Sequence, residues 1–237
     1  MPIEIAVSGA CGKTGARVCA LALQDSAYRL VYAIERAGHP LMGRDVGEAV
    51  GLPPTGIKIC DRLPAKTGVL IDFSAPASVA MRVEECAGTG TALLVGTTGL
   101  DEPLRARILD ASRKIPCLVA ANMSVGANLL AHLAAEAAKS LGGAYDIEIV
   151  ETHHRSKKDS PSGTALKIAE AVAGASGRTT QDLVFGRGRG SEPRKAREIA
   201  IHAVRAGDIV GDHTVLISGP GERLELTHRA HSRDVFA

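Results

Sequence analysis

SGACGKTG, residues 8–15, ends in Gly-Lys-Thr and also places its glycines three residues apart. A phosphate-binding P-loop follows the pattern G-x-x-x-x-G-K-[ST], which needs a glycine at the position of Val7. The other interpretation is a dinucleotide-binding turn that follows a buried strand over residues 3–8 and opens a helix at about Lys13. Because Val7 does not fit the P-loop, we predict this second turn, with its helix N-terminus facing phosphates. Its glycines are Gly9, Gly12 and Gly15.

The stretch LVYAIERAG ends another apolar run in a carboxylate and a cation. Glu35 lies roughly 20 residues beyond the glycine turn, where a dinucleotide site holds the adenosine ribose hydroxyls. A carboxylate suits the free 2'-hydroxyl of NAD, whereas Arg36 suits the 2'-phosphate of NADP or stacks on adenine. The sequence therefore leaves both NADH and NADPH open as cofactors.

Composition places the chain among ordinary globular proteins. Its 237 residues are 45% hydrophobic and 23% charged, with a formal net charge of +2. Aromatic residues make up only 3% and Trp is absent, so small anions are better candidate ligands than nucleic acid. Glu4 enters a strand at once, where a signal peptide would be basic and then apolar, and no run is long enough to span a membrane. We expect a cytoplasmic protein without nucleic-acid or membrane partners.

The five cysteines are odd in number and form no C-x-x-C pair, which argues against a disulfide framework and against a zinc site. A reducing cytosol fits this usage, and we expect no metal. Cys11 stands near a predicted helix N-terminus, a position that can activate a thiol. We favour the simpler interpretation, a small residue that fills the turn.

Two domains are indicated by a change of pattern near Ser124. Before it, short Val/Ile/Leu-rich runs alternate with helical segments, which predicts an α/β, Rossmann-like parallel sheet with helices on both faces. After it, two helices and several strands joined by glycine turns predict a second, α+β domain with a mixed or antiparallel sheet. The expected domains are residues 1–123, with 234–237 returning to them, and residues 124–233. The candidate strands are residues 3–8, 30–34, 56–60, 69–73, 92–96, 116–121, 145–154, 199–207, 208–218 and 222–230, and the second domain's helices are 126–143 and 162–175.

The most basic stretch is GRGRGSEPRKAR, residues 186–197. Glu192 interrupts its charge, glycine and proline loosen it, and it has no aromatic residue. We expect a mobile surface loop rather than a nucleic-acid patch.

Two loops follow predicted strands of the parallel sheet: IDFSAP, residues 71–76, and VGTTG, residues 95–99. Ligands of open parallel sheets bind beyond the carboxyl ends of the strands, so we expect both loops to line the nicotinamide half of a cleft. The small residues Gly96, Thr97 and Thr98 would let a flat ring approach the backbone.

The stretch ETHHRSKKDSPSGTA, residues 151–165, is the richest in chemistry. Helix-start amides at about Ser162, with a threonine hydroxyl and nearby cations, predict a carboxylate site. A histidine beside it can supply or remove a proton near neutral pH. Adjacent histidines on a strand point to opposite faces, which disfavours a metal site. The residues alone therefore predict a reductase for an anionic small molecule.

The motifs, in order along essentially the whole chain, resemble those of the 4-hydroxy-tetrahydrodipicolinate (dihydrodipicolinate) reductase family of bacterial lysine and diaminopimelate synthesis. The resemblance implies NADH- or NADPH-dependent reduction of that cyclic dicarboxylate to tetrahydrodipicolinate with loss of water, by a homotetramer assembled through the second domain's sheet. Family members usually continue beyond SRxxFA through a helix that returns to the nucleotide domain, so we expect this chain to leave apolar surface uncovered there. The matching stretches are VSGACGKTG, AIERAG, IDFSAP, VGTTG, AANMSVGAN, ETHHRSKKDSPSGTA, RAGDIVGDHTV and LTHRAHSRDVFA.

The same resemblance implies residue roles. His153 resembles the general acid/base, and Lys157 resembles its partner in catalysis. The residues that resemble the substrate-carboxylate site are His154, Ser162, Gly163 and Thr164. Those that resemble the cofactor site are Gly9, Ala10, Cys11, Gly12, Lys13, Thr14, Gly15, Glu35, Arg36, Phe73, Gly96, Thr97, Thr98, Ala120, Ala121, Asn122, Met123 and Arg233.

Two other functions remain open at this point. One is another two-domain amino-acid dehydrogenase, such as an aspartate dehydrogenase, which shares the glycine turn but lacks the HHRSKKDSPSGT loop. The other is a noncatalytic NAD(P)-sensing regulator, against which the intact loop speaks. Turnover of the cyclic dicarboxylate distinguishes all three.

Overall fold

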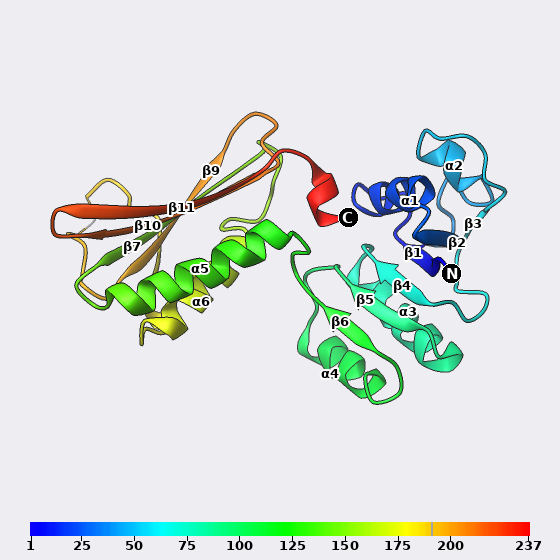
Figure 1. The fold of residues 1–237 in the computed structure, drawn as a ribbon, viewed down its shortest axis with the longest axis horizontal. Coiled ribbons are helices and arrows are strands. Elements are labelled where there is room, and N and C mark those ends of the chain that lie inside the picture. The colour runs from blue at the N-terminus through cyan, green and yellow to red at the C-terminus, as the bar shows by residue number, and fades with distance from the viewer. Residues whose placement is uncertain (191) are drawn as a thin grey trace. The chain divides into compact units, whose positions relative to one another are not determined.

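The computed structural model describes residues 1–190 and 192–237 of the chain. They form two compact units, Met1–Ala121 with Phe236–Ala237, and Asn122–Val235, each described by itself below (Figure 1). Ser191, in the basic stretch expected to be a mobile loop, lies outside the described residues.

The first unit is built on a six-stranded sheet in which every pairing is parallel. The strand order, β3-β2-β1-β4-β5-β6, is that of a doubly wound dinucleotide-binding fold. The chain order reverses direction between β1 and β4, so the turns after these two strands lie together. This confirms the predicted Rossmann-like sheet. The strands are β1 (Ile3–Ser8), β2 (Tyr28–Ile34), β3 (Ile59–Cys60), β4 (Val69–Asp72), β5 (Ala92–Val95) and β6 (Cys117–Val119).

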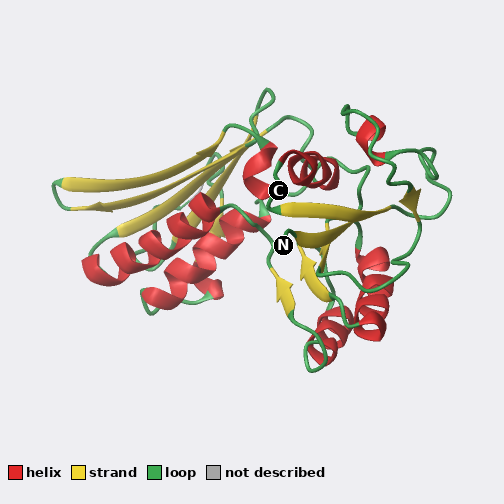
Figure 2. Cartoon of the chain, turned by 45° about the vertical axis from the view of Figure 1, so that its right-hand side comes forward, coloured by secondary structure: helices red, strands yellow, loops and turns green. Residues whose placement is uncertain are grey.

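Helices cover both faces of this sheet (Figure 2). Successive residues of a strand point to opposite faces, and in β1 Ile5 and Val7 join one core cluster while Ala6 joins the other. The first cluster contains residues of α1 and α2, and the second contains residues of α3 and α4. The helices are α1 (Gly15–Gln24), α2 (Val46–Ala49), α3 (Pro76–Thr89) and α4 (Glu102–Ala111).

The second unit contains a five-stranded mixed sheet in the order β11-β10-β7-β9-β8. β7 pairs parallel with β9 and antiparallel with β10, which confirms the predicted mixed sheet. Its elements are α5 (Val125–Leu141), β7 (Asp146–His153), α6 (Gly163–Ala175), the 3-10 turn η1 (Thr180–Asp182), β8 (Leu183–Phe185), β9 (Ile199–Arg205), β10 (Gly211–Gly219), β11 (Glu222–Ala230) and the 3-10 turn η2 (Arg233–Phe236).

α5 and α6 pack on one face of this sheet, where Ile147 and Ile149 of β7 enter the core. β7 alternates buried and partly exposed residues along its whole length. Since side chains alternate across a strand, the next two residues on the inward face are Glu151 and His153, both buried. The core face of β7 thus ends in a carboxylate and a histidine.

Some boundaries differ from those expected. α1 begins at Gly15 rather than near Lys13, because Thr14 forms the N-cap. β8 and α2 were missed, since three or four residues are too short to show a hydrophobic period. Among the described residues, no helix is both long and apolar enough to cross a membrane.

Candidate functional site

The glycine turn after β1 is held by backbone contact. Gly9 has φ +78°, and a Cβ there would lie 2.4 Å from the carbonyl oxygen of Phe73, which follows β4. A Cβ on Gly15 would lie 2.1 Å from the carbonyl oxygen of Gly9. At Gly12 the same test gives 3.1 Å to Gly9 O, so crowding within the protein is milder there. Gly9 and Gly15 therefore shape the turn, while Gly12 has more room toward a ligand.

Glu35 lies beside this turn. Its Oε2 accepts a hydrogen bond from the Cys11 N–H (3.2 Å), and its Oε1 accepts one from the Arg36 N–H (2.9 Å). Burial, and then the nearby Glu35 carboxylate, raise the pKa of the Cys11 thiol. A raised thiol pKa disfavours the activated-thiol interpretation of Cys11 and agrees with a small residue that fills the turn.

Cys11, Glu35 and His39 bring potential metal-ligand atoms within 4.8 Å of one another. Both carboxylate oxygens already accept amide hydrogens, and His39 Nδ1 accepts one from the Leu41 N–H (3.2 Å). Each Glu35 oxygen keeps a second acceptor position, which can receive a ligand hydroxyl.

Asp72, at the end of β4, joins the two loops expected near a nicotinamide. The Thr97 hydroxyl donates to its Oδ1 (2.6 Å), and the Ser74 hydroxyl donates to both carboxylate oxygens (2.9 Å each). Ser74 N in turn donates to the Thr97 hydroxyl (2.8 Å). The Thr97 hydroxyl therefore supports the loops from within. Sequence reasoning missed Asp72, although a carboxylate ending a buried strand was a usable signal.

The aromatic ring that lies against Gly96 in this unit belongs to Phe73 of the same chain. A Cβ on Gly96 would lie 2.1 Å from Cε1 of Phe73, so the glycine is needed to seat that ring. Ala120 N donates to Val95 O (3.0 Å), which places the residues after β6 beside the end of β5. Of the other expected cofactor residues, Ala10, Thr98 and Ala121 belong to the first unit, and Met123 and Arg233 belong to the second.

In the second unit, His153 and Glu151 form a buried pair. His153 Nδ1 lies 2.5 Å from Glu151 Oε2, and the carboxylate side chain has no exposed surface. An ionised carboxylate only accepts hydrogen bonds, so Nδ1 carries the proton that points at Glu151. Nε2 of His153 is then the atom left for chemistry.

Glu151 is kept ionised by its neighbours. Arg205 donates from Nη1 to Oε2 and from Nη2 to Oε1 (2.8 Å each), and Ser162 N donates to Oε1 (2.9 Å). Burial raises the pKa of the Glu151 carboxyl, but hydrogen bonds from His153, Arg205 and Ser162 outweigh it and lower that pKa to about 2.

A second histidine lies against the first. The rings of His213 and His153 meet edge to face with centroids 5.2 Å apart, and His213 Nε2 lies 3.1 Å from the Ser162 hydroxyl. Burial, and then the proximity of His153, lower the pKa of His213 to about 4. His213 is therefore neutral at physiological pH and packs behind His153 as an uncharged ring.

The loop after β7 carries the expected substrate residues. Lys157 Nζ pairs with Asp159 Oδ1 (2.8 Å), and the Ser156 hydroxyl lies 2.8 Å from His154 Nδ1. Ser162 is the N-cap of α6, and its hydroxyl accepts from Ala165 N (3.1 Å). The cations thus precede a capped helix start, as the sequence predicted.

Asn122 was expected beside the cofactor, but its side chain is bonded within the second unit. Its Nδ2 donates to the Thr164 hydroxyl (2.9 Å), and its Oδ1 accepts from Ser124 N (2.8 Å). Asn122 therefore orients the hydroxyl of one of the expected substrate residues.

Three residues around His153 were missed: Glu151, Arg205 and His213. The period of two along β7 was a signal for Glu151, because residues 151 and 153 share a face. Arg205 and His213 become neighbours only through strand pairing, opposite His153 and Glu151 respectively. The register of β9 and β10 relative to β7 cannot be read from a single sequence.

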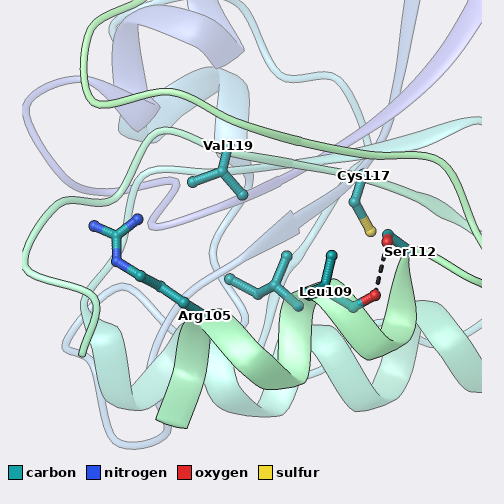
Figure 3. Close-up of a pocket in the computed structure, with 6 residues that line it drawn as sticks. Arg105, Leu109, Ser112, Cys117 and Val119 are labelled. Carbon is teal, nitrogen blue, oxygen red and sulfur yellow. Dashed lines mark hydrogen bonds between the residues drawn. The ribbon is translucent and has the colours of Figure 1, made fainter. Parts of the chain in front are cut away.

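A shallow groove of about 260 Å³ lies elsewhere on the first unit, between α4 and β6 (Figure 3). Its apolar rim includes Leu109, 68% exposed, and Val119, 40% exposed. It contains none of the predicted site residues. Its lining residues are Arg105, Ile108, Leu109, Ser112, Cys117 and Val119.

Comparison with known proteins agrees with this architecture. The family model described as dihydrodipicolinate reductase, N-terminus, matches residues 3–123, and that described as dihydrodipicolinate reductase, C-terminus, matches residues 126–237. The chain is 45% identical to the 4-hydroxy-tetrahydrodipicolinate reductase of Geobacter sp. (strain M21), over 99% of this chain and 90% of the relative. It is also 45% identical to that of Thiobacillus denitrificans (strain ATCC 25259 / T1), over 100% of this chain and 90% of the relative.

A solved structure gives the same result at the level of the fold. The dipicolinate-bound dihydrodipicolinate reductase from Paenisporosarcina sp. TG-14 has a TM-score of 0.75 and 25% sequence identity, and the match covers 100% of this chain and 91% of that one.

Proposed function

Because the chain belongs to the dihydrodipicolinate reductase family, we propose that it reduces 4-hydroxy-tetrahydrodipicolinate to tetrahydrodipicolinate and water in the diaminopimelate route to lysine. The observation within the molecule that best supports this is a buried glutamate–histidine pair next to a capped helix start. It combines a proton donor with a site for a carboxylate, which reduction of an anionic ring requires.

The first unit would hold NADH or NADPH. Thr14, the N-cap of α1, makes no side-chain cap hydrogen bond, so the positive end of the helix dipole faces the turn where a pyrophosphate would bind. The Glu35 carboxylate, fixed beside the turn by amide hydrogen bonds, would accept from the ribose hydroxyls. A bound nicotinamide supplies the hydride. The glycine turn and Glu35 therefore fit the pyrophosphate and ribose of such a cofactor, with Arg36, Phe73 and residues 96–98 proposed as further contacts.

Residues of the second unit would handle charge and the proton. The free amides of Gly163 and Thr164, with the Thr164 hydroxyl, would bind one substrate carboxylate, and Lys157 and His154 would neutralise its charge. Nε2 of His153 would give the proton that accompanies the hydride, and loss of the 4-hydroxyl as water balances the reaction. Positioned charges of this kind stabilise developing charge without reorganisation.

Cofactor choice follows from Glu35 and Arg36. The carboxylate repels a 2'-phosphate while the guanidinium attracts it, so we propose that both NADH and NADPH are used. Glu35→Ala should then favour NADPH, measured as the ratio of kcat/KM for the two cofactors. An unchanged ratio would show that Glu35 does not bind the ribose.

We also propose a homotetramer assembled through the face of the second sheet that α5 and α6 leave open. This face presents partly buried side chains such as Val150 and Leu216, which alternate with the core residues of β7 and β10. Light scattering should give about four times the 24.6 kDa chain mass. Leu216→Arg should lower the mass, and an unaltered tetramer would place the interface elsewhere.

The decisive experiment is oxidation of NADH and NADPH with substrate freshly generated from aspartate semialdehyde and pyruvate. Turnover would support the proposed reductase. Cofactor binding without turnover would instead indicate a sensing protein, and turnover of aspartate would indicate an amino-acid dehydrogenase.

A further inference from the structure

We propose that Glu151 and Arg205 act together as positioning residues, holding His153, the start of α6 and the Lys157 loop in one fixed arrangement. The inference rests on the proposed function, because it assigns roles relative to that reaction. Neither residue needs to touch substrate or cofactor.

The carboxylate of Glu151 is fully used by three different elements. Each of its oxygens accepts two hydrogen bonds: Oε2 from His153 Nδ1 and Arg205 Nη1, and Oε1 from Ser162 N and Arg205 Nη2. Four acceptor positions are about all that a carboxylate offers. One side chain therefore ties the proton donor on β7 to the N-cap of α6, where the substrate carboxylate would bind.

The pair also decides which nitrogen of His153 faces the reaction. With Nδ1–H bound to Glu151, the ring is fixed in rotation and Nε2 is directed toward Gly211. A Cβ on Gly211 would lie 3.0 Å from Nε2, so the glycine keeps that nitrogen uncrowded. A histidine that served only to fill the core would need neither the hydrogen bond from Nδ1 to Glu151 nor a glycine at position 211.

Arg205 extends the arrangement into the loop. Its Nη2 also donates to the carbonyl oxygen of Asp159 (2.6 Å), and the carboxylate of Asp159 holds Lys157 Nζ at 2.8 Å. The guanidinium therefore links the loop that carries Lys157 to the carboxylate that orients His153. Lysine could not do this, because its single ammonium lacks the planar fork.

Stability alone is a poor reason for such a pair. Glu151 is fully buried and the Arg205 side chain is 19% exposed, so both lose much of their hydration. Replacing a buried ion pair with apolar residues of similar volume is often neutral or stabilising. A role in positioning explains why charged groups occupy this place.

The test compares two pairs on opposite faces of β7. The variants are Glu151→Gln and the double variant Glu151→Gln/Arg205→Met, which removes both charges so that neither is left buried and unpaired. The matched control is Glu148→Gln/Arg194→Met, which removes an ion pair from the other face of the same strand. Melting temperature and oligomeric state are measured for all variants alongside wild type.

Glu151→Gln should lower kcat by roughly 10- to 10⁴-fold, between the loss seen for groups that orient metal-bound histidines and that seen when the carboxylate fixing a catalytic histidine's tautomer is removed. The pH profile of kcat should also differ from that of wild type, because an amide now replaces the carboxylate that binds the His153 ring. The double variant should fold, show the same loss of kcat and bind dipicolinate severalfold more weakly, with NADH affinity unchanged. The control pair lies on the sheet face proposed for the tetramer, next to Leu216, so it is compared only where the oligomeric state matches that of wild type. At matched oligomeric state it should change none of these quantities.

Imidazole nitrogen NMR separates this proposal from the proposed function. Wild type should show the His153 proton on Nδ1, and the variants should show a mixture of tautomers, whether or not the chosen substrate is turned over. A folded double variant with wild-type kcat, pH profile and tautomer would overturn the inference. So would a loss of kcat without any change in tautomer or pH profile. Lack of turnover in wild type would instead contradict the proposed function.

Discussion

Glu148 and Glu151 lie on the same strand and each binds an arginine and a histidine, yet they face opposite sides of the second sheet. Glu148 receives Arg194 Nε (3.0 Å) and His202 Nε2 (2.6 Å), with its side chain 24% exposed. Glu151 receives Arg205 and His153 with no exposure at all. The same three residue types therefore form two clusters, one inside and one at the surface.

The difference lies in what each cluster connects. On the outer face, Arg194 also reaches Asp146 (2.7 Å), so the charges form a network of side chains partly open to water. On the inner face, the hydrogen bonds end on the helix start at Ser162 and the loop at Asp159. A buried carboxylate with all its acceptor positions used makes geometry strict, whereas an exposed network tolerates rearrangement.

The largest expected difference is catalytic. His153→Ala should lower kcat by roughly 10²- to 10⁴-fold, the range for loss of a positioned acid or base, with NADH affinity nearly unchanged. His202→Ala, the matching change on the outer face, should leave kcat near wild type. Steady-state kinetics at matched oligomeric state provide the test. Near-normal turnover of His153→Ala would show that another group supplies the proton.

A second contrast concerns stability. Arg205→Ala leaves Glu151 buried without its cation and should lower the free energy of unfolding by about 3–5 kcal/mol. Arg194→Ala, on the outer face, should cost about 1 kcal/mol or less for the single chain, in which water can replace its contacts. Urea denaturation measures both. Equal losses would mean that burial does not distinguish the two clusters.

The inner cluster should also make stability depend on pH. The folded-state pKa of His213, about 4, lies below its ordinary value of 6.5, so the unfolded chain binds more protons between these limits. The stabilising contribution is present above pH 6.5 and lost as pH falls toward 4, at up to about 1.4 kcal/mol per pH unit. His153, Glu151, His228 and Lys157 are the charged or titratable groups that act on His213.

His213→Gln should flatten the dependence of unfolding free energy on pH within that window. Glu151 acts in a lower window, because its pKa of about 2 lies below its ordinary 4.5, and its contribution is lost as pH falls through that range. A wild-type protein equally stable at pH 7 and pH 5 would contradict a neutral, buried His213.

The smallest expected effect belongs to Glu148. Glu148→Gln should change the free energy of unfolding by about 0.2–1 kcal/mol, and high salt should reduce the difference from wild type. An effect that persists in high salt would indicate that the outer cluster is more shielded from water than its exposure suggests.

Much of this organisation could be predicted from the sequence. The strand–glycine–helix unit and Glu35 predicted the parallel sheet, because hydrophobic runs and glycine spacing are local signals. The HHRSKKDSPSGTA motif indicated the helix start at Ser162. Arg205 and His213 could not be predicted, since β9 and β10 reach His153 and Glu151 only through a strand register set by the whole fold.

The basic stretch after β8 is another case in which the sequence alone does not show which residues become neighbours. Arg187 pairs with Glu198 (2.5 Å) and Arg197 with Asp182 (3.3 Å), and Arg194 binds the carboxylates of β7. The sequence showed these cations as a run, which local reasoning interprets as solvated. The structure pairs Arg187, Arg194 and Arg197 with carboxylates from other elements, so these three charges of the run are neutralised locally.

The backbone contacts of Gly9 have a practical consequence for redesign. The shape of the glycine turn comes from close contact between main-chain atoms of residues 9 and 73, and from the missing Cβ of Gly15, which would meet Gly9 O. The exposed side chain of Lys13 can therefore be exchanged while the backbone of the turn stays rigid. A change of cofactor preference should be attainable there with few substitutions. By contrast, a single methyl group on Gly9 would clash with the carbonyl oxygen of Phe73 and disrupt the turn.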